Sequence, residues 1–241
     1  MTNPRTGLSV SVIIPARNES AAIVAAVRSA READADEVIV VDGESRDGTP
    51  DAARLVADAV ILSAPGRARQ MNAGAEASTG EVLVFLHADT TMAKGSIAAV
   101  REAVGREDVQ GGAFSVRLGV SADAPPLRRA AFGLTSRMIN LRARLFRAYT
   151  GDQAIFLRRD AFESVGGYPD IPLMEDVELS RLLARRGRTA LLPVPVITSA
   201  RRWEENGTLR TIFLMWGLRL AYLLGMPPAR CADLYGRKTR G

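Results

Sequence analysis

The sequence is poor in the residues that build disulfide frameworks and histidine metal sites. Its 241 residues include one cysteine, Cys231, and one histidine, His87. A single cysteine excludes an intrachain disulfide framework and is typical of a reducing compartment, so we expect a cytoplasmic protein. A single histidine excludes any metal site that needs a second imidazole.

Long apolar runs are also missing. The most apolar helical stretch covers residues 209–224 and carries Arg210 and Arg219. A membrane-spanning helix needs roughly 20 apolar residues. Residues 1–9 contain no apolar segment of signal-peptide length. We therefore expect a protein that is not integral to a membrane.

Lysine is scarce, although the chain is basic. Of 32 basic residues only Lys94 and Lys238 are lysines, and the net charge is +5 with a pI near 10.0. No basic stripe is interleaved with aromatic residues, so we expect no nucleic-acid partner. Phosphate-bearing ligands and an anionic membrane surface remain compatible with this charge.

Two common nucleotide-binding fingerprints are absent: no G-x-G-x-x-G follows the first predicted strand, and there is no Walker A motif. Strand-like and helix-like segments nevertheless alternate along the first part of the chain. Strands are predicted at 9–14, 37–42, 59–62 and 82–86, and helices at 20–33, 49–57 and 67–78. This alternation predicts an α/β fold with a mostly parallel sheet, with Pro15 ending the first strand and Ser20 capping the first helix.

The second half is less regular. Helices are predicted at 96–104, 127–148, 161–165, 175–186 and 209–224, and strands at 112–118, 153–157 and, as two short pieces, around Pro193 and Pro195. A hydrophobic fraction of 47% and a charged fraction of 24% are ordinary for a globular chain. We expect one domain over 1–241, with a nucleotide-binding half at 9–90, a second half at 91–205 and a C-terminal helical appendage at 206–241.

Polar residues follow three of the predicted strands, and the carboxyl ends of parallel strands are where ligands bind. Asp89 can hold a hard divalent cation that bridges phosphate oxygens, and Asp42 can accept from a base imide or a ribose hydroxyl. Arg67 lies near a helix N-terminus, which suits anionic oxygens. Turn and capping roles fit Asp42 and Asp89 as well.

Taken together, these pieces resemble the family 2 glycosyltransferases of the GT-A fold. The shared pieces, in the family's order and spacing, are Pro15-x-x-Asn18-Glu19, Val41-Asp42-Gly43-x-Ser45-x-Asp47-Gly48-Thr49, Asn72-x-Gly74 with Gly80, Phe85-Leu86-x-Ala88-Asp89, Gly111-Gly112 and Glu175-Asp176. The resemblance spans roughly residues 9–203. It implies a Rossmann-like nucleotide-diphospho-sugar transferase with a mostly parallel central sheet flanked by helices.

The resemblance also implies a reaction: inverting transfer of a sugar from a nucleotide diphosphate sugar, expected to be a UDP-sugar, to a hydroxyl acceptor with Mg²⁺ or Mn²⁺. Asp89 would hold the metal, Asp176 would be the general base, and Glu175 would bind the acceptor or support the site. The acceptor would meet Asp152, Gln153 and Trp203. The implied nucleotide-sugar-binding residues are Pro15, Arg17, Asn18, Glu19, Asp42, Ser45, Arg67, His87, Ala88 and Arg202.

Two positions depart from the family pattern. His87 stands where the first acid of the D-x-D motif belongs; it suits Mn²⁺ more than Mg²⁺, or it hydrogen-bonds ribose instead. Ser199 replaces the glutamine of the Q-x-x-R-W motif, which argues against a processive polysaccharide synthase. The acid at position 176 also fits a purely structural role, because the helix dipole favours acids in a first turn.

The acceptor stays open between a small molecule and a lipid phosphate. The whole pattern is similar to a short bacterial subfamily commonly labelled as glycosyltransferases of arsenosugar biosynthesis. One alternative is a polyprenyl-phosphate glycosyltransferase, docked peripherally at the inner face of the membrane through helices 127–148 and 209–224. The same helices could instead pack internally or form a homodimer interface. A non-catalytic nucleotide-sugar-binding protein is the alternative from another class.

Overall fold

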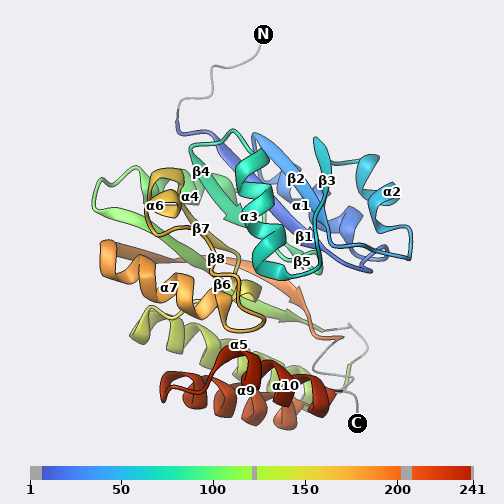
Figure 1. Cartoon of the computed structure of the whole chain (residues 1–241), viewed down its shortest axis with the longest axis vertical. Helices are drawn as coiled ribbons and strands as arrows, with labels where there is room; N and C mark the ends of the chain where they lie inside the picture. The colour runs from blue at the N-terminus through green and yellow to red at the C-terminus, as the bar shows by residue number, and fades with distance from the viewer. Residues whose placement is uncertain (1–6, 121–123, 202–207, 240–241) are drawn as a thin grey trace.

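A computed structural model describes residues 7–120, 124–201 and 208–239, with side chains described outside 208–213 and 237–239. Over these residues the strands form one eight-stranded sheet in the order β3-β2-β1-β4-β7-β6-β8-β5. Helices flank the sheet, and α5, α9 and α10 gather at the end of the molecule away from the N-terminus (Figure 1).

The first half confirms the predicted alternation. Its elements are β1 (Val10–Ala16), α1 (Ile23–Glu32), β2 (Glu37–Asp42), α2 (Thr49–Arg54), β3 (Ala59–Leu62), α3 (Arg67–Ala77) and β4 (Val82–Phe85). All three pairings among β1, β2, β3 and β4 are parallel. The strands carry continuous apolar runs because both faces of the sheet are covered.

Two local predictions in this half were wrong. Pro15 does not end β1; it pairs with Val41 inside the parallel ladder, and the strand runs on to Ala16. Ser20 does not cap α1, which begins at Ile23 after Ala22 without a side-chain cap. The backbone N–H of Ser20 donates to Asp47 instead, so a contact from another loop delays the start of the helix.

The second half is built from more pieces than predicted. Its elements are β5 (Thr90–Thr91), α4 (Ser96–Val104), β6 (Val109–Gly119), α5 (Pro126–Phe146), η1 (Gly151–Gln153), β7 (Ile155–Arg158), α6 (Arg159–Ser164), α7 (Glu175–Arg186), β8 (Arg188–Ser199), α9 (Thr208–Leu223) and α10 (Pro228–Thr239). The two short strands predicted around Pro193 and Pro195 are one strand, β8. A register shift in the β6–β8 pairing accommodates the two prolines. Gln153 lies in the 3₁₀ turn η1 and not in the strand.

The topology brings distant segments to one edge of the sheet. β7 runs antiparallel to β4, with Phe85 opposite Ile155, so the residues before β7 lie beside the end of β4. β5 follows β4 in the chain but pairs with β8, with Thr90 opposite Thr198. Residues 86–89 therefore cross between two distant strands of the sheet.

The core lies on both faces of the sheet. On β1, Val12 and Ile14 belong to one apolar cluster and Ile13 to the other, and all three are fully buried. Helix α3 approaches closely because Gly74 has no side chain: a Cβ there would lie 2.4 Å from Cγ2 of Ile13. This close packing fixes α3, and with it Arg67, against the ends of β1 and β2.

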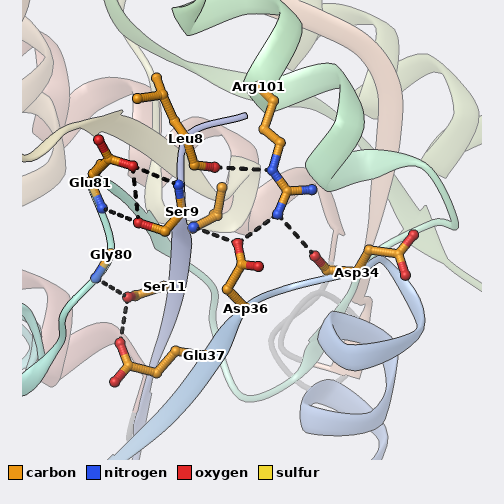
Figure 2. A network of polar contacts seen from close by, with 10 residues as sticks. Leu8, Ser9, Ser11, Asp34, Asp36, Glu37, Gly80, Glu81 and Arg101 are labelled. Atoms are coloured by element: carbon orange, nitrogen blue, oxygen red, sulfur yellow. Dashed lines mark hydrogen bonds and ion pairs between the residues drawn. The ribbon is translucent and has the colours of Figure 1, made fainter. Parts of the chain in front are cut away.

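A polar network connects the amino ends of β1, β2 and β4 (Figure 2). Arg101 on α4 donates to the carbonyl of Leu8 at 3.0 Å and to Oδ2 of Asp36 at 2.5 Å. Ser11 donates to Glu37 and accepts from the backbone N–H of Gly80. These contacts hold β1, β2 and β4 in register.

The C-terminal helices pack against the start of α7. Met174, Leu218 and Cys231 form one buried cluster, and the hydroxyl of Tyr222 donates to Oε2 of Glu178 at 3.0 Å. Among the helices that the structure describes, none is both long and apolar enough to cross a bilayer.

Candidate functional site

The loops after β1 and β2 are joined to each other. The backbone N–H of Asn18 donates to Oγ of Ser45, and the backbone N–H of Arg46 donates to Oδ1 of Asn18, both at 2.9 Å. Asn18 adopts a φ of 54°, in the left-handed region that asparagine tolerates better than most residues. The two loops therefore form one surface, called the ledge below, in which two of the predicted nucleotide-binding residues, Asn18 and Ser45, are in contact.

Asp47 stabilises the same two loops through hydrogen bonds with Ser20 and Thr49. Hydrogen bonds from the Thr49 side chain and the Ser20 backbone lower the pKa of Asp47. Thr49 in turn accepts from the backbone N–H of Glu19 at 2.8 Å. The sequence pattern Asp47-Gly48-Thr49 therefore works as a structural brace between the two loops.

Asp42 ends β2 and is only 1% exposed. Its Oδ2 accepts from the backbone N–H of Ser45 at 3.0 Å. Its Oδ1 is buried and accepts no hydrogen bond from any residue that the structure describes. Such an atom is costly unless a ligand N–H or water satisfies it, so Asp42 fits the predicted contact with a nucleobase.

Gln70 was not predicted as part of the site, yet it organises this end of it. Its Nε2 donates to the carbonyls of Ala16 at 2.9 Å and Val41 at 2.8 Å. It thereby connects the ends of β1 and β2. No local sequence signal pointed to Gln70, because its burial depends on how α3 packs on these two strands.

Glu19 is occupied within the protein. Nη2 of Arg201 donates to both of its carboxylate oxygens, at 2.8 and 2.9 Å. This ion pair ties the end of β8 to the loop after β1. Pro15 is half-buried and Arg17 is exposed beside it. Arg202 and Trp203, predicted to meet the diphosphate and the acceptor, lie outside the described residues.

The residues after β4 are held by their backbone. The N–H of Ser199 donates to the carbonyl of Asp89 at 3.0 Å, and the N–H of Thr90 donates to the carbonyl of His87 at 3.0 Å. Ala88 is buried, and the Asp89 side chain is half-buried at the edge of the sheet. The segment is therefore rigid, and it leaves the carboxylate of Asp89 within reach of a ligand.

His87 faces inward. Its Nε2 is buried, and a Cβ added to Gly151 would lie 2.3 Å from that atom. The imidazole therefore packs on the Gly151 backbone, and only glycine leaves it room. This packing of Nε2 against Gly151 favours a positioning role for His87 over ligation.

The described residues contain no cluster of three or more His, Cys, Asp or Glu side chains that could hold a metal on its own. Mg²⁺ and Mn²⁺ sites that use substrate phosphates need only one or two carboxylates from the protein. The half-buried carboxylate of Asp89 fits that kind of shared site.

Asp176 lies in the first turn of α7. The backbone N–H of Gly151 donates to its Oδ2 at 2.9 Å, and the backbone N–H of Val177 donates to its Oδ1 at 2.7 Å. Burial, followed by the negative charge of Glu175, raises the pKa of Asp176 to about 6. A carboxyl with such a pKa can take a proton near neutral pH.

Glu175 has a different environment from its neighbour. It is 3% exposed, and Nη1 of Arg67 donates to its Oε1 at 3.3 Å. Burial opposes the charge of Arg67, but the carboxylates of Glu175 and Asp176 outweigh it and raise the Arg67 pKa. The two adjacent acids thus differ: Glu175 is paired with Arg67, whereas Asp176 has a raised pKa.

A small cavity of about 80 Å³ opens beside these groups. Its lining includes Arg67, Glu175 and Asp176, together with Met215, Arg219 and Tyr235 from α9 and α10. The C-terminal helices therefore border the predicted catalytic acids. This contact could not be predicted from the sequence, because residues far apart in the chain make it.

Gln153 is fully buried, although it was predicted to meet the acceptor. Its Oε1 accepts from Thr150 and from Arg142, and its Nε2 donates to the carbonyl of Phe114 at 3.3 Å. These bonds support η1 and Gly151 from beneath. Asp152, in the same turn, is half-buried and nearer the surface.

Comparison with known proteins adds a family to this geometry. A sequence model described as Glycosyl transferase family 2 matches residues 11–166. The match includes the loops after β1, β2 and β4 and ends before Glu175 and Asp176. No curated protein matches the chain.

Solved structures share the fold at low sequence identity. S. aureus TarS 1-349 has a TM-score of 0.60 and 17% identity, and the alignment includes 82% of this chain and 62% of the TarS chain. The mannosyltransferase PcManGT from Pyrobaculum calidifontis, in complex with GDP-Man and Mn²⁺, has a TM-score of 0.61 and 20% identity, with 99% of this chain covering 72% of that one. Glucosyl-3-phosphoglycerate synthase from Mycobacterium tuberculosis, in complex with Mg²⁺ and UDP, has a TM-score of 0.59 and 19% identity, and the alignment includes 79% of this chain and 71% of the synthase chain.

The chain therefore spans less than two thirds of the TarS chain that it matches. Identities this low establish the fold and nothing beyond it. That fold is the predicted one: a mixed α/β domain of the GT-A type with helices on both sides of its central sheet.

Proposed function

The chain belongs to glycosyl transferase family 2, and from that membership we propose that it transfers a sugar from a nucleotide diphosphate sugar to an acceptor hydroxyl, with inversion. Structures of similar fold hold UDP, UDP-GlcNAc, or GDP-Man with Mn²⁺. A UDP-sugar is our proposed donor. The arsenosugar label and the cytoplasmic location stay predictions from the sequence.

The observation that carries the proposal is the environment of Asp176. Burial raises its pKa to about 6, and the Gly151 N–H orients its carboxylate. In the proposed step the acceptor oxygen attacks the anomeric carbon of the sugar while Asp176 takes the hydroxyl proton. The bond from that carbon to the diphosphate oxygen breaks, and its electron pair leaves with the nucleotide. One displacement from the opposite face inverts the anomeric centre.

The nucleoside end of the site would use the ledge after β1 and β2. The unsatisfied Oδ1 of Asp42 suits an imide N–H of the base. Asn18 and Ser45 would shape the ledge on which the nucleoside lies, since their own contacts are made with each other.

The diphosphate end would use Asp89 and the positive charge nearby. Asp89 would hold Mg²⁺ or Mn²⁺ together with diphosphate oxygens. When bound, the ion supplies positive charge for the departing diphosphate. Arg67 lies at the start of α3, and its salt bridge with Glu175 holds it close to Asp176. Arg202, predicted for the same role, remains a candidate outside the described residues.

Titration calorimetry with UDP and with GDP, each in Mn²⁺ and in EDTA, tests the donor site. We expect UDP to bind in Mn²⁺, and Asp89→Ala to abolish this metal-dependent binding. Glu76→Ala is the matched control, because Glu76 is an exposed acid on α3 away from the site. Absence of nucleotide binding under all conditions would refute the proposal.

Turnover of a UDP-sugar separates an enzyme from a protein that only binds nucleotide sugars. We expect slow release of UDP by the wild-type chain with water as acceptor, and none by Asp176→Asn. Glu163→Gln, at an exposed acid on α6, should behave as wild type. Equal turnover in wild type and Asp176→Asn would remove Asp176 from the mechanism.

A further inference from the structure

A large groove lies between helices α5, α7 and α9. Its volume is about 770 Å³, which is within the range of ligand sites. Leu141, Leu145 and Phe146 line it from α5, and Trp216 and Leu220 from α9. Leu145 is 64% exposed and Trp216 50% exposed. Apolar side chains of this size, left open on two facing helices, mark a binding surface.

The groove is positively charged as well as apolar. Five arginines line it: Arg142, Arg147, Arg181, Arg185 and Arg219. No acidic residue is among its described lining. Only Arg181 forms an ion pair with another described residue, Glu178. The wall therefore carries an excess of guanidinium groups that an anion would complement.

Two of these arginines have buried atoms that lack an acceptor. The Nε atoms of Arg142 and Arg219 are buried and donate to no residue that the structure describes. Arg142 uses Nη2 for Thr150 and Gln153, so its position is fixed while Nε stays unused. Buried N–H groups normally have partners, and here a ligand can supply them.

The groove adjoins the cavity beside the proposed base. Arg219 lines both the groove and the cavity that contains Glu175 and Asp176. Val177, which directly follows Asp176, also lines the groove. A molecule seated in the groove can thus place its inner end beside the proposed base.

We propose that this groove binds the acceptor, and that the acceptor is an anionic lipid whose head group carries a phosphate and a free hydroxyl. Its hydrocarbon chain lies against Leu145 and Trp216. Its phosphate accepts from Arg142 and Arg219. This inference rests on the proposed function: the head-group hydroxyl gives its proton to Asp176 as its oxygen bonds to the sugar carbon, and the nucleotide diphosphate leaves.

A second copy of the chain fits this groove less well. In a two-fold dimer the same patch meets itself, so the arginines of one copy would face those of the other. No acidic residue in the described lining could offset that repulsion. A phosphate-bearing lipid complements both the charge and the apolar walls.

Calorimetric titration of the full chain with dodecyl phosphate, below its micelle concentration, tests the inference. We expect saturable binding that is much weaker for inorganic phosphate, which lacks the chain, and for dodecyl maltoside, which lacks the charge. Arg219→Gln should weaken dodecyl phosphate binding about tenfold, as loss of a charge-assisted hydrogen bond does. Arg142→Gln should act in the same direction, but it also removes bonds to Thr150 and Gln153, so Arg219→Gln carries the decision.

Matched controls separate site effects from general ones. Arg137→Gln removes an exposed arginine of α5 that does not line the groove, and it should leave binding unchanged. Leu145→Asp should weaken binding, whereas Leu55→Asp, at an 85% exposed leucine that does not line the groove, should not. Thermal unfolding of each variant confirms that it is folded.

Three outcomes would overturn the inference. Dodecyl phosphate fails to bind although UDP binds with metal; in that case the transferase proposal stands alone. Dodecyl phosphate and dodecyl maltoside bind equally, which removes the role of the arginines. Sedimentation shows a dimer that Leu145→Asp dissociates, which assigns the groove to a second copy. Binding of dodecyl phosphate without any nucleotide binding would instead refute the proposed function and the acceptor role with it.

Discussion

The backbone N–H of Gly151 donates a hydrogen bond of 2.9 Å to Oδ2 of Asp176. The imidazole of His87 packs against the other side of the same glycine. One residue without a side chain thus connects the segment after β4, which would face the diphosphate, with the acid on α7. Changes at any of the three should therefore affect the other two.

Gly151→Ala should damage the site more than the fold. The new Cβ would lie 2.3 Å from Nε2 of His87, so the ring or the turn η1 must move. A displacement of about 1 Å in a catalytic site costs up to about a hundredfold in rate. We expect a loss of at least about tenfold in turnover, with UDP affinity changed less, measured by kinetics and calorimetry.

Gly133→Ala is the control for that substitution. Gly133 lies on α5 with nothing within 4 Å of an added Cβ, so alanine there should raise helix stability by about 0.5–1 kcal/mol and leave turnover alone. If Gly151→Ala matched wild type in turnover, the coupling through Gly151 would be unimportant for the reaction.

The pH dependence of turnover should report Asp176. Burial and Glu175 raise its pKa to about 6, and only the carboxylate form can accept the hydroxyl proton. We therefore expect kcat/KM to fall as the pH drops through about 6 and to be flat just above it. A profile without that acidic limb would contradict the assignment of Asp176 as base.

Asp176→Asn should separate activity from stability. A carboxyl whose folded pKa is raised stabilises the fold only while it is protonated, and this contribution is lost as pH rises through about 6. At pH 8 the asparagine removes the cost of a buried charge and keeps one oxygen for the Gly151 N–H, while the hydrogen bond from the Val177 N–H is lost. We expect a higher Tm than wild type at pH 8, with turnover reduced by about 10²–10⁴.

The same comparison at acid pH is its control. Below the pKa of the unfolded aspartate the side chain of residue 176 is neutral in wild type as well as in Asp176→Asn, so the difference in Tm between the two should disappear. A variant less stable than wild type at pH 8 would show that the charge of Asp176 supports the fold, for example through Arg67.

Asp42→Asn tests the nucleoside end of the site. Asparagine keeps one oxygen for the Ser45 N–H and puts an amide N–H₂ where Oδ1 lacks a partner. Two donors would then face each other if a base imide binds there, so UDP affinity should fall about tenfold or more. Asp51→Asn, at a side chain that is 80% exposed on α2, is the control, and unchanged UDP affinity in Asp42→Asn would place the base elsewhere.

The sequence predicted the parts of the fold in which local pattern and tertiary contact agree. β2, β3, α4 and α7 have the expected bounds, and in β2, α4 and α7 the buried hydrophobic residues belong to the apolar pattern. Ser20 was misjudged because capping depends on a contact with Asp47 from another loop. Gln153 was predicted in a strand but lies in η1, where contacts with Phe114 and Arg142, which are distant in the chain, hold it.

The site shows the same division. Polar residues after strands predicted Asp42 and Asp89 as site residues, since strand ends of a parallel sheet converge, whereas only the family resemblance implied Asp176, which lies in the first turn of α7. The inward orientation of His87 depends on Gly151, and the groove depends on how α9 packs against α5 and α7. Neither relationship leaves a local signature, so both required the fold.

Arg101→Met should destabilise the protein without affecting nucleotide binding. Arg101 and Asp36 are each only 20% exposed, and their salt bridge measures 2.5 Å. Methionine keeps the apolar stem but leaves Asp36 and the Leu8 carbonyl without this donor, and breaking a buried pair in this way costs about 3–5 kcal/mol. Because the pair is partly open to solvent, we expect a loss of about 2–3 kcal/mol in the free energy of unfolding, measured by urea denaturation.

Arg106→Met on the following turn is the control. It removes a 66% exposed partner of Glu102 at 4.0 Å and should change stability by less than about 0.5 kcal/mol. Arg101 lies at the amino ends of the strands, whereas the site lies at their carboxyl ends. UDP affinity at low temperature should therefore match wild type in both variants. A loss of affinity confined to Arg101→Met would show that the network positions the ledge as well as the sheet.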